Sequence, residues 1–359
     1  MDHRLRRLRV ESELEERRLD VLLVSHLPNI RYLSGFSGSS GVLLIAPREA
    51  VLITDGRYRE QAKQEVQGAR LKIVKQPLLT SAALWLNRRR SLRRIGVEPA
   101  HMTMADRAAL SKALARGRSI VGAPPIVERL RMIKDGEEIG RIRAACGLGV
   151  KLFDTLISKL RPGISERRLA ALLELAAREA GADEMSFPTI IASGERSALA
   201  HHRAGNAPIP SKGFVVSDFG VILAGYCSDM TRTVHLGRPT REARSAYEAV
   251  REAQQAAVEL VKPGVRAAKV DQAARKLLYN RKLGKYFTHS TGHGVGLEIH
   301  EAPRLAARQE EVLQPGMVVT IEPGVYLPGK WGVRIEDTVV LTETGCDILT
   351  PCPKDLLTL

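Results

Sequence analysis

The chain has 359 residues, 44% of them hydrophobic, and a formal net charge of +15 at pH 7, which suits two globular domains and excludes an intrinsically disordered chain. No run of 18 apolar residues is present, so we expect no transmembrane helix, and the basic amino terminus lacks the apolar segment of a secretory signal. Because no aromatic side chains interleave the basic ones, we expect an arginine-rich solvated surface, with no nucleic-acid or membrane partner. Four scattered cysteines predict reduced thiols and a cytoplasmic location.

The first 124 residues predict an α/β domain, because short apolar runs alternate with helical patterns. The glycine- and serine-rich run 34–41 lacks the Gly-Lys-Ser/Thr ending of a phosphate loop, and no helical pattern follows it, so we expect an ordinary loop. Strands are predicted over 20–25, 41–46, 50–54 and 94–97, and helices around 57–66, 80–90 and 103–116.

A domain boundary is predicted after residue 124, in a glycine- and proline-rich stretch, and helices are predicted over 135–160 and 166–180. The second part contains an internal repeat, since LRPGISERRLAAL at 160–172 resembles VKPGVRAAKVDQA at 261–273. The repeat predicts two similar halves, related by a pseudo-twofold axis, with a site at their junction.

Four carboxylates occupy two predicted hairpins, one in each half. A two-residue turn at 223–224 pairs Asp218 with Asp229, because opposed residues in a hairpin have a constant index sum. A turn at 328–330 pairs Glu322 with Glu336 in the same way. Directly opposed like charges are destabilising, and two divalent cations bound between them would remove the repulsion, so we predict a two-metal site.

A histidine-rich segment, FTHSTGHGVGLEIHE at 287–301, adds three imidazoles to this constellation. Its glycines argue against a helix, so we expect a loop or strand whose backbone passes close to the site. Four carboxylates and one neutral imidazole balance the charge of two divalent cations. Such an oxygen-rich site suits Mn²⁺, with Co²⁺ and Zn²⁺ as the other candidates.

The motifs DFG, GYCSDMTRT, HSTGHGVGLEIHE, TIEPG and VRIEDT, in this order and spacing, resemble the pita-bread metallopeptidases, and within them the Xaa-Pro branch of aminopeptidase P and prolidase. NIRYLSGFSGSSG and LITDGRY resemble the amino-terminal domain shared with creatinase. The resemblance implies an α/β (α+β) chain: a creatinase-like domain over 1–124 and a pita-bread catalytic domain with pseudo-twofold halves over 125–359.

The resemblance also implies residue roles. His300 would stabilise the oxyanion, and Glu322 would carry the proton from the attacking hydroxide to the leaving nitrogen. His201 would contact the substrate near proline; because Ala200 stands where the family usually has proline, the choice between His201 and His202 stays open. His289 and Arg334 would support binding or orientation. The implied metal ligands are Asp218, Asp229, His293, Glu322 and Glu336.

The implied activity is metal-dependent hydrolysis of an amino-terminal Xaa-Pro bond by a hydroxide held between two metal ions. We expect an Xaa-Pro aminopeptidase acting on peptides with proline in second position, probably the alternative being an Xaa-Pro dipeptidase (prolidase) acting on dipeptides. A non-catalytic pita-bread binding protein, a methionine aminopeptidase and creatinase are disfavoured, the last two because of the long amino-terminal part and the intact ligands. The family implies a homodimer.

Overall fold

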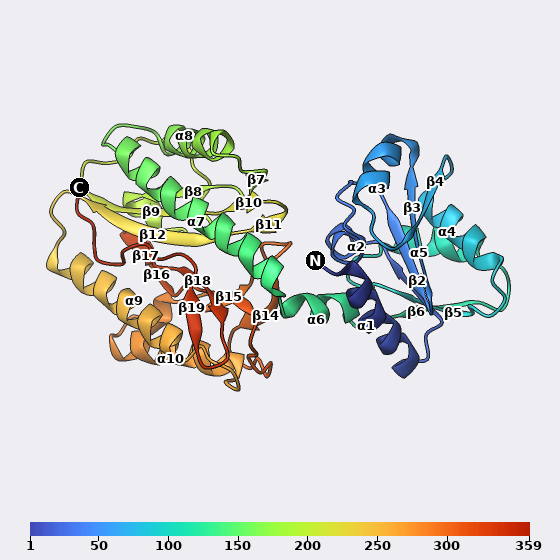
Figure 1. Ribbon diagram of the computed structural model, residues 1–359. Coiled ribbons are helices and arrows are strands. Elements are labelled where there is room, and N and C mark those ends of the chain that lie inside the picture. The colour runs from blue at the N-terminus through green and yellow to red at the C-terminus, as the bar shows by residue number, and fades with distance from the viewer. The chain divides into compact units, whose positions relative to one another are not determined.

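The computed structural model describes all residues from 1 to 359, which divide into two compact units, Met1–Arg131 and Met132–Leu359. The first unit is built on a six-stranded sheet in the order β4-β3-β2-β1-β5-β6, with α4 and α5 on one side and α1 and α2 on the other (Figure 1). Its helices are α1 (His3–Glu16), α2 (Leu27–Ser34), α3 (Arg59–Glu65), α4 (Leu78–Asn87), α5 (Met104–Ala113) and α6 (Ile126–Met132), which contains the boundary between the units. Its strands are β1 (Val21–Val24), β2 (Val42–Ala46), β3 (Glu49–Asp55), β4 (Arg70–Val74), β5 (Arg94–Val97) and β6 (Ser119–Gly122).

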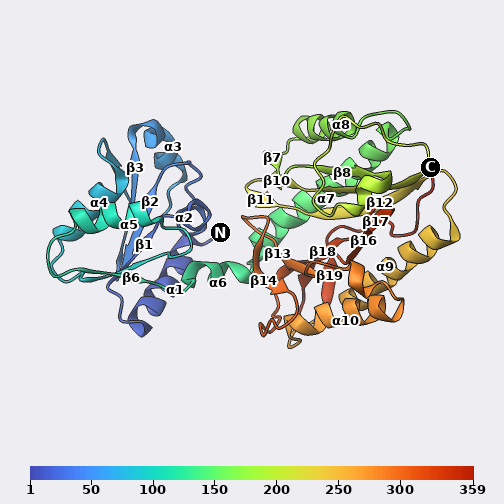
Figure 2. The same ribbon diagram turned by 180° about the vertical axis from the view of Figure 1, so that it is seen from behind.

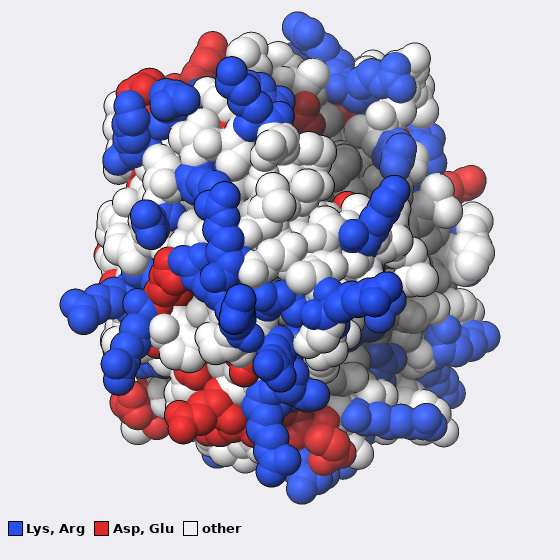
Figure 3. Space-filling view, turned by 90° about the vertical axis from the view of Figure 1, so that its right-hand side faces the viewer, with Lys and Arg blue, Asp and Glu red and all other residues white.

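The predicted α/β character of this unit is confirmed, but its first two helices were not predicted. Helix α1 lacks an apolar stripe because its buried face carries basic side chains. Arg6 donates to the carbonyl of Tyr32, and Arg7 donates to the carbonyls of Gln67 and Gly68. Part of the positive charge therefore holds the fold together. The other basic side chains are spread in separate groups across the face seen in Figure 3.

The second unit places its strands between two pairs of helices (Figures 1 and 2). A sheet in the order β12-β9-β8 belongs to the first half, and one in the order β14-β13-β15-β18-β19 to the second. Its helices are α7 (Gly136–Lys159), α8 (Glu166–Glu179), α9 (Arg241–Glu259) and α10 (Ala267–Asn280). Its strands are β7 (Glu184–Met185), β8 (Ile190–Ser193), β9 (Gly213–Phe219), β10 (Val221–Leu223), β11 (Tyr226–Cys227), β12 (Met230–Leu236), β13 (Gly292–Gly294), β14 (Glu301–Leu305), β15 (Val318–Ile321), β16 (Gly324–Leu327), β17 (Trp331–Arg334), β18 (Asp337–Leu341) and β19 (Cys346–Ile348). None of the chain's helices is both long and apolar enough to span a membrane.

The internal repeat has matching backbone conformations in the two halves. Gly163 and Gly264 have φ angles of 85° and 84°, and their amides donate to the carbonyls of Ile209 and Leu313. Each glycine precedes the second helix of its pair, α8 or α10. Each half also has its own apolar core beneath its helices. The predicted pseudo-twofold arrangement is thus present in the backbone.

The first carboxylate hairpin has a different register from the predicted one. Its turn is formed by Ala224 and Gly225, which both have positive φ angles of 50° and 81°, as a tight type I′ turn requires. The turn therefore lies one residue later than predicted, and Asp218 is paired with Thr231 instead of Asp229. Because the partner shifts by two residues, Asp229 still lies on the same face of the ribbon, so the error does not separate the two carboxylates.

The second carboxylate hairpin has the predicted register. Leu327 is paired with Trp331 in the β16–β17 ladder, and Ile321 with Asp337 in the β15–β18 ladder. Both pairs have the index sum that the turn at 328–330 predicts. Glu322 and Glu336, which lie between these two ladders, consequently fall opposite each other.

The extents of the two domains were predicted as 1–124 and 125–359, whereas the compact units meet between Arg131 and Met132, near the end of α6. The assignment of separate functional domains to these extents stays a prediction.

Candidate metal centre and substrate cleft

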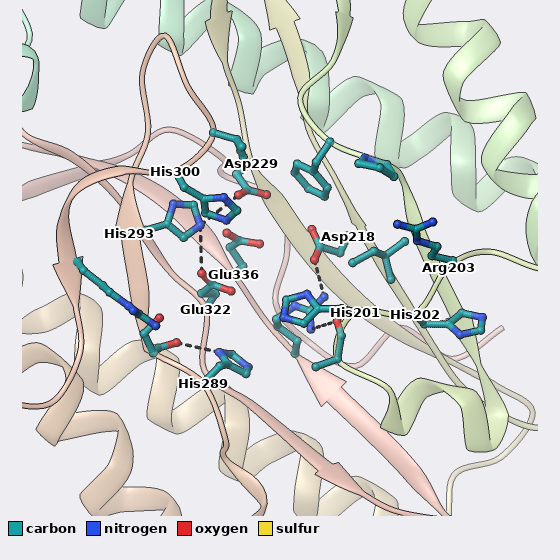
Figure 4. A pocket seen from close by; sticks show the side chains of 18 of the residues that line it. His201, His202, Arg203, Asp218, Asp229, His289, His293, His300, Glu322 and Glu336 are labelled. Carbon is teal, nitrogen blue, oxygen red and sulfur yellow. Dashed lines mark hydrogen bonds and ion pairs between the residues drawn. The ribbon is translucent and has the colours of Figure 1, made fainter. Parts of the chain in front are cut away.

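One cleft in the second unit, with a volume of about 630 Å³, brings together the ten residues singled out from the sequence. Figure 4 shows the acidic side chains of both hairpins pointing toward one another across it. The ten lining residues are His201, His202, Asp218, Asp229, His289, His293, His300, Glu322, Arg334 and Glu336. The cleft is also lined by two arginines, Arg203 and Arg304, that were not predicted.

Three buried carboxylates form the centre of the cluster. Ligand-type oxygens of Asp218, Asp229 and Glu336 all lie within 4.8 Å of one another. Oδ1 of Asp218 and Oε1 of Glu336 are buried without a hydrogen-bond partner. Buried carboxylate oxygens without donors are costly, and a pair of such oxygens aimed into one cleft fits a divalent cation that takes oxygen ligands.

His293 and Glu322 extend the cluster on its other side. Nε2 of His293 lies 3.6 Å from Oδ2 of Asp229 and 3.3 Å from Oε1 of Glu322. Nδ1 of His293 lies 3.0 Å from the carbonyl oxygen of Gly294, which fixes the proton on Nδ1 and leaves Nε2 as the ligand atom. The structure thus brings all five predicted ligands into one cluster.

The glycines around His293 have a steric cause. A Cβ atom on Gly292 would lie 1.8 Å from the carbonyl oxygen of Thr320 on β15. Strand β13 is therefore pressed against its neighbour, and the backbone amide of His293 donates to Oγ1 of Thr320. The expected loop or strand is a short strand, and its close approach carries the imidazole to the carboxylates.

Burial and mutual repulsion raise the pKa values of the central carboxylates. Burial, followed by the charges of Glu336 and Asp218, raises the pKa of Asp229 well above its ordinary value. Burial, followed by the charges of Glu322 and Asp218, does the same to the pKa of Glu336. A group of carboxyls whose charges oppose one another in this way is what a bound cation would neutralise.

Asp218 and Glu322 each have one cationic neighbour. Burial raises the pKa of Asp218, although the adjacent Arg334 guanidinium opposes the rise. Burial also acts to raise the pKa of Glu322, but the hydrogen bond and charge of His293 outweigh it and lower that pKa to about 2. Glu322 is therefore ionised, and it keeps its basicity suppressed for as long as His293 donates to it.

Arg334 is a positioning residue at the cleft floor. Its guanidinium forms an ion pair with Asp218 and donates to the hydroxyl of Tyr326 and, over 3.2 Å, to the carbonyl of Ala200. The side chain is 4% exposed. With its donors used in this way, it is suited to orient Asp218, the neighbouring tyrosine and the loop that carries His201.

The two adjacent histidines of that loop lie in different environments. Nε2 of His202 lies 2.8 Å from Oε2 of the fully buried Glu166, which also accepts from Ser193 and Arg196. His201 has no such partner and is exposed within the cleft. In Figure 4, His201 lies beside Asp218, whereas His202 lies at the periphery. The geometry favours His201 as the substrate contact and His202 as an anchor of the loop.

His289 and His300 line the cleft on either side of His293. Nε2 of His289 lies 3.0 Å from the hydroxyl of Tyr326, and burial lowers the pKa of His289. The ring of His300 packs edge-on against that of His293, with 4.4 Å between their centroids. Burial, with the charge of His293 as the next cause, lowers the pKa of His300. Both imidazoles are consequently neutral hydrogen-bonding groups at neutral pH.

With this geometry in view, the chain can be assigned to a family. Residues 140–343 match the model of metallopeptidase family M24, and residues 4–133 match the creatinase/prolidase N-terminal domain. The chain belongs to family M24, and it is a metallo-exopeptidase with the pita-bread fold. The family and fold predicted from the motifs are confirmed.

Relatives of known structure or function cover almost the whole chain. It is 38% identical over 346 residues to the Xaa-Pro dipeptidase of Pyrococcus furiosus, covering 96% of this chain and 97% of the relative. A solved Xaa-Pro dipeptidase from Bacillus anthracis matches with a TM-score of 0.96 at 37% identity, over 100% of both chains. A solved X-Pro aminopeptidase from Thermotoga maritima matches with a TM-score of 0.87 at 36% identity, over 96% of this chain and 99% of the other.

Proposed function

We propose that this chain is an Xaa-Pro dipeptidase that uses two divalent metal ions. The observation that carries the proposal is the charge pattern of the cleft, which has an acidic cluster at its centre and two arginines on its lining. A dipeptide carries a cationic amino group and a free carboxylate close together. The cleft offers groups of the opposite sign for both.

The two arginines favour the dipeptidase over the aminopeptidase that we expected first. Arg203 and Arg304 are exposed within the cleft, and neither forms an ion pair with an acidic side chain. An arginine fork is suited to a carboxylate, and a dipeptide places its carboxylate on the proline itself. In a longer peptide that position is an amide. The relatives named as Xaa-Pro dipeptidases support the same choice.

In the proposed site, Asp218, Asp229, His293, Glu322 and Glu336 hold the metal ions. Bound there, two divalent ions lower the pKa of water and polarise the scissile carbonyl. Once Nε2 of His293 serves as a ligand, it no longer donates to Glu322, and that carboxylate regains the basicity to accept a proton. An oxygen-rich ligand set of this kind suits Mn²⁺, which we propose as the native metal, to be tested against Co²⁺ and Zn²⁺ in reconstitution.

The neutral imidazoles complete the proposed mechanism. His300 donates a hydrogen bond to the oxygen of the scissile carbonyl, where negative charge develops in the transition state. His201 contacts the substrate near the proline ring, with Phe187, Pro188 and Ile190 supplying an apolar wall of the cleft. His289 holds Tyr326, and through it Arg334, in place.

A length and end-group series tests the proposal. The metal-reconstituted protein is assayed with Ala-Pro, Ala-Pro-NH₂ and Ala-Pro-Ala. We expect Ala-Pro to be cleaved most efficiently, and Arg203→Met and Arg304→Met each to raise KM for Ala-Pro by roughly tenfold or more, as expected for loss of a charge-assisted hydrogen bond. Cleavage of Ala-Pro-Ala at the rate of Ala-Pro would contradict the dipeptidase assignment and restore the aminopeptidase.

Two calls from the sequence are kept as proposals. A homodimer is tested by sedimentation equilibrium of the full chain. The cytoplasmic location rests on cysteine usage, and Cys146, Cys227, Cys346 and Cys352 are all free thiols.

A further inference from the structure

A second hollow in the catalytic unit, with a volume of about 570 Å³, shares no lining residue with the metal cleft. It lies along one face of α10 and beside the loop that follows β14. Its volume lies within the range of small-molecule sites. Its lining residues are Arg266, Ala268, Lys269, Asp271, Gln272, Arg275, Lys276, Tyr279, Ala307, Arg308 and Glu310, which we call the α10 groove.

The charge of the α10 groove is strongly positive. Five of its side chains are cationic and two are carboxylates, which leaves an excess of three positive charges. Both carboxylates are already neutralised, Asp271 by Arg275 at 2.7 Å and Glu310 by Arg266 at 2.8 Å.

Three cations of the groove remain available for a ligand. Lys269 has only the side-chain oxygen of Gln272 at 3.4 Å, and neither Lys276 nor Arg308 forms an ion pair with an acidic side chain of the groove. Lysine and arginine side chains gathered in a hollow without acidic partners are suited to phosphate groups.

Two further features distinguish the groove from an ordinary solvated helix face. Arg308 has a φ angle of 66°, a left-handed conformation that is costly for a residue with a Cβ and that clusters at functional sites. Tyr279 lies in the groove with 77% of its surface exposed, and an open aromatic face beside cations provides a surface on which a planar ring can stack.

The floor of the groove is connected to the metal centre by hydrogen bonds. The guanidinium of Arg275 donates to the carbonyls of Phe287 and His289. Oδ1 of Asp271 accepts from the amide and the hydroxyl of Thr291, at 3.1 and 2.8 Å. The ion pair thus holds the segment 287–291 from its outer side.

On its inner side, the same segment supports the metal ligands. The carbonyl of Thr291 accepts from the backbone amide of Glu322 at 2.8 Å, and His293 follows two residues later. An anion that binds Arg275 would compete with Asp271 for the guanidinium and alter the restraint on this segment.

We propose that the α10 groove binds a small anion with two or more phosphate groups, and that binding alters the segment 287–291 that supports Glu322 and His293. The proposal is independent of the peptide specificity of the cleft. Pyrophosphate and a nucleoside diphosphate share the required chemistry, and they differ in whether a ring is available to stack on Tyr279.

Calorimetric titration of the full-length, metal-free chain with pyrophosphate and with ADP tests the binding, since chelation of metal ions then plays no part. We expect saturable binding that weakens at least tenfold in the double variant Lys276→Ala/Arg308→Ala. The matched control is Lys151→Ala/Arg161→Ala, which removes the same charge from exposed positions outside the groove and is expected to change the affinity less than twofold.

Several outcomes would overturn the site. These are no binding at millimolar pyrophosphate and ADP, equal weakening in the control variant, or loss of binding in Arg203→Met with none in Lys276→Ala/Arg308→Ala, which would place the anion in the metal cleft. Equal affinities for the two anions would support phosphate recognition alone. Tighter binding of ADP that Tyr279→Ala removes would support the nucleotide.

Amide hydrogen exchange of the same metal-free chain tests the connection to the metal centre. Saturating pyrophosphate is expected to change the exchange rates over residues 287–293 in the wild type and not in Lys276→Ala/Arg308→Ala. Unchanged exchange in the saturated wild type would contradict the connection.

Discussion

Two consecutive residues, Glu336 and Asp337, present the two kinds of buried charge in this molecule. Both are at most 1% exposed. Asp337 is surrounded by donors, since Oδ1 accepts from Arg232 at 2.7 Å, and Oδ2 accepts from Lys354 at 2.8 Å and from Gln254 at 2.9 Å. Burial acts to raise the pKa of Asp337, but Arg232 and Lys354 outweigh it and lower that pKa.

Glu336 faces other carboxylates. Its Oε2 accepts from the hydroxyl of Thr231 at 2.7 Å, while its Oε1 has no donor. The strand reverses the direction of successive side chains, so one residue enters a compensated network and the next enters the metal cluster. The comparison teaches that burial and residue type do not define the metal centre; the absence of cationic partners does.

The largest expected effect is on catalysis at Glu336. Glu336→Gln keeps the size of the side chain but removes a ligand charge, so we expect kcat/KM for Ala-Pro to fall on the order of 10³-fold, the several kcal/mol that metal-assisted charge stabilisation supplies. The metal-free variant is expected to be no less stable than the wild type, because a repulsive charge is gone. Near wild-type activity would contradict the assignment of Glu336 as a ligand.

The next effect is on stability at Asp337. Asp337→Ala leaves Arg232 buried without its partner, and we expect the free energy of unfolding to fall by about 3–5 kcal/mol. Urea denaturation of the metal-free protein measures it. As a matched control, Arg232→Met/Asp337→Leu removes both charges and should recover part of the loss; a double variant weaker than Asp337→Ala would show that the pair does not account for the effect.

Metal binding should stabilise the region around Glu336 by a smaller amount. At free metal 100 times above its dissociation constant, we expect the free energy of unfolding to rise by about 2.7 kcal/mol for a single site. Thermal denaturation with and without Mn²⁺ checks this in the wild type and in Glu336→Gln. An equal rise in both proteins would place the stabilising metal elsewhere.

The smallest effect is on the pH dependence of the metal-free protein, where the two regions have opposite signs. The raised pKa values of Asp229 and Glu336 mean that their folded forms retain protons, so stability falls as pH rises from the ordinary carboxyl value through the raised values. The lowered pKa of Asp337 gives stability above the ordinary value that is lost as pH falls through the lowered one.

Glu336→Gln should therefore flatten the pH dependence above about pH 4.5, by up to about 1.4 kcal/mol per pH unit for one proton. Denaturation curves of the metal-free proteins between pH 4 and pH 8 provide the measurement. A slope identical to that of the wild type would show that Glu336 titrates as an ordinary carboxyl.

The sequence predicted the parts of the fold that regular patterns govern. Strand β5 was predicted at its observed bounds, Arg94–Val97, and the second hairpin in its observed register. Helix α1 was missed because its buried arginines satisfy backbone carbonyls in place of forming an apolar stripe. Helix α2 was missed although Pro28 in its first turn and Gly35 at its end, with a φ of 84°, are the usual boundary signals.

The acidic cluster was predictable because opposed like charges on two hairpins have no simple structural role, and a register error of two residues preserves the face of a strand. The cleft arginines were not predicted. Arg203 and Arg304 are about one hundred residues apart, and only the folded chain shows that both line the same cleft. Glu166 was missed for the same reason, since nothing in the sequence connects it to His202.

The central claim is that the unpartnered carboxylates on one side of β18 are a two-metal site. We would dialyse the chelator-treated wild type, Glu336→Gln and Asp337→Asn against Mn²⁺ and measure metal content per chain alongside cleavage of Ala-Pro. The account predicts two ions per folded wild-type chain with activity, a loss of metal and activity in Glu336→Gln, and retention of both in folded Asp337→Asn. Equal metal content in all three proteins, or an active metal-free wild type, would contradict it.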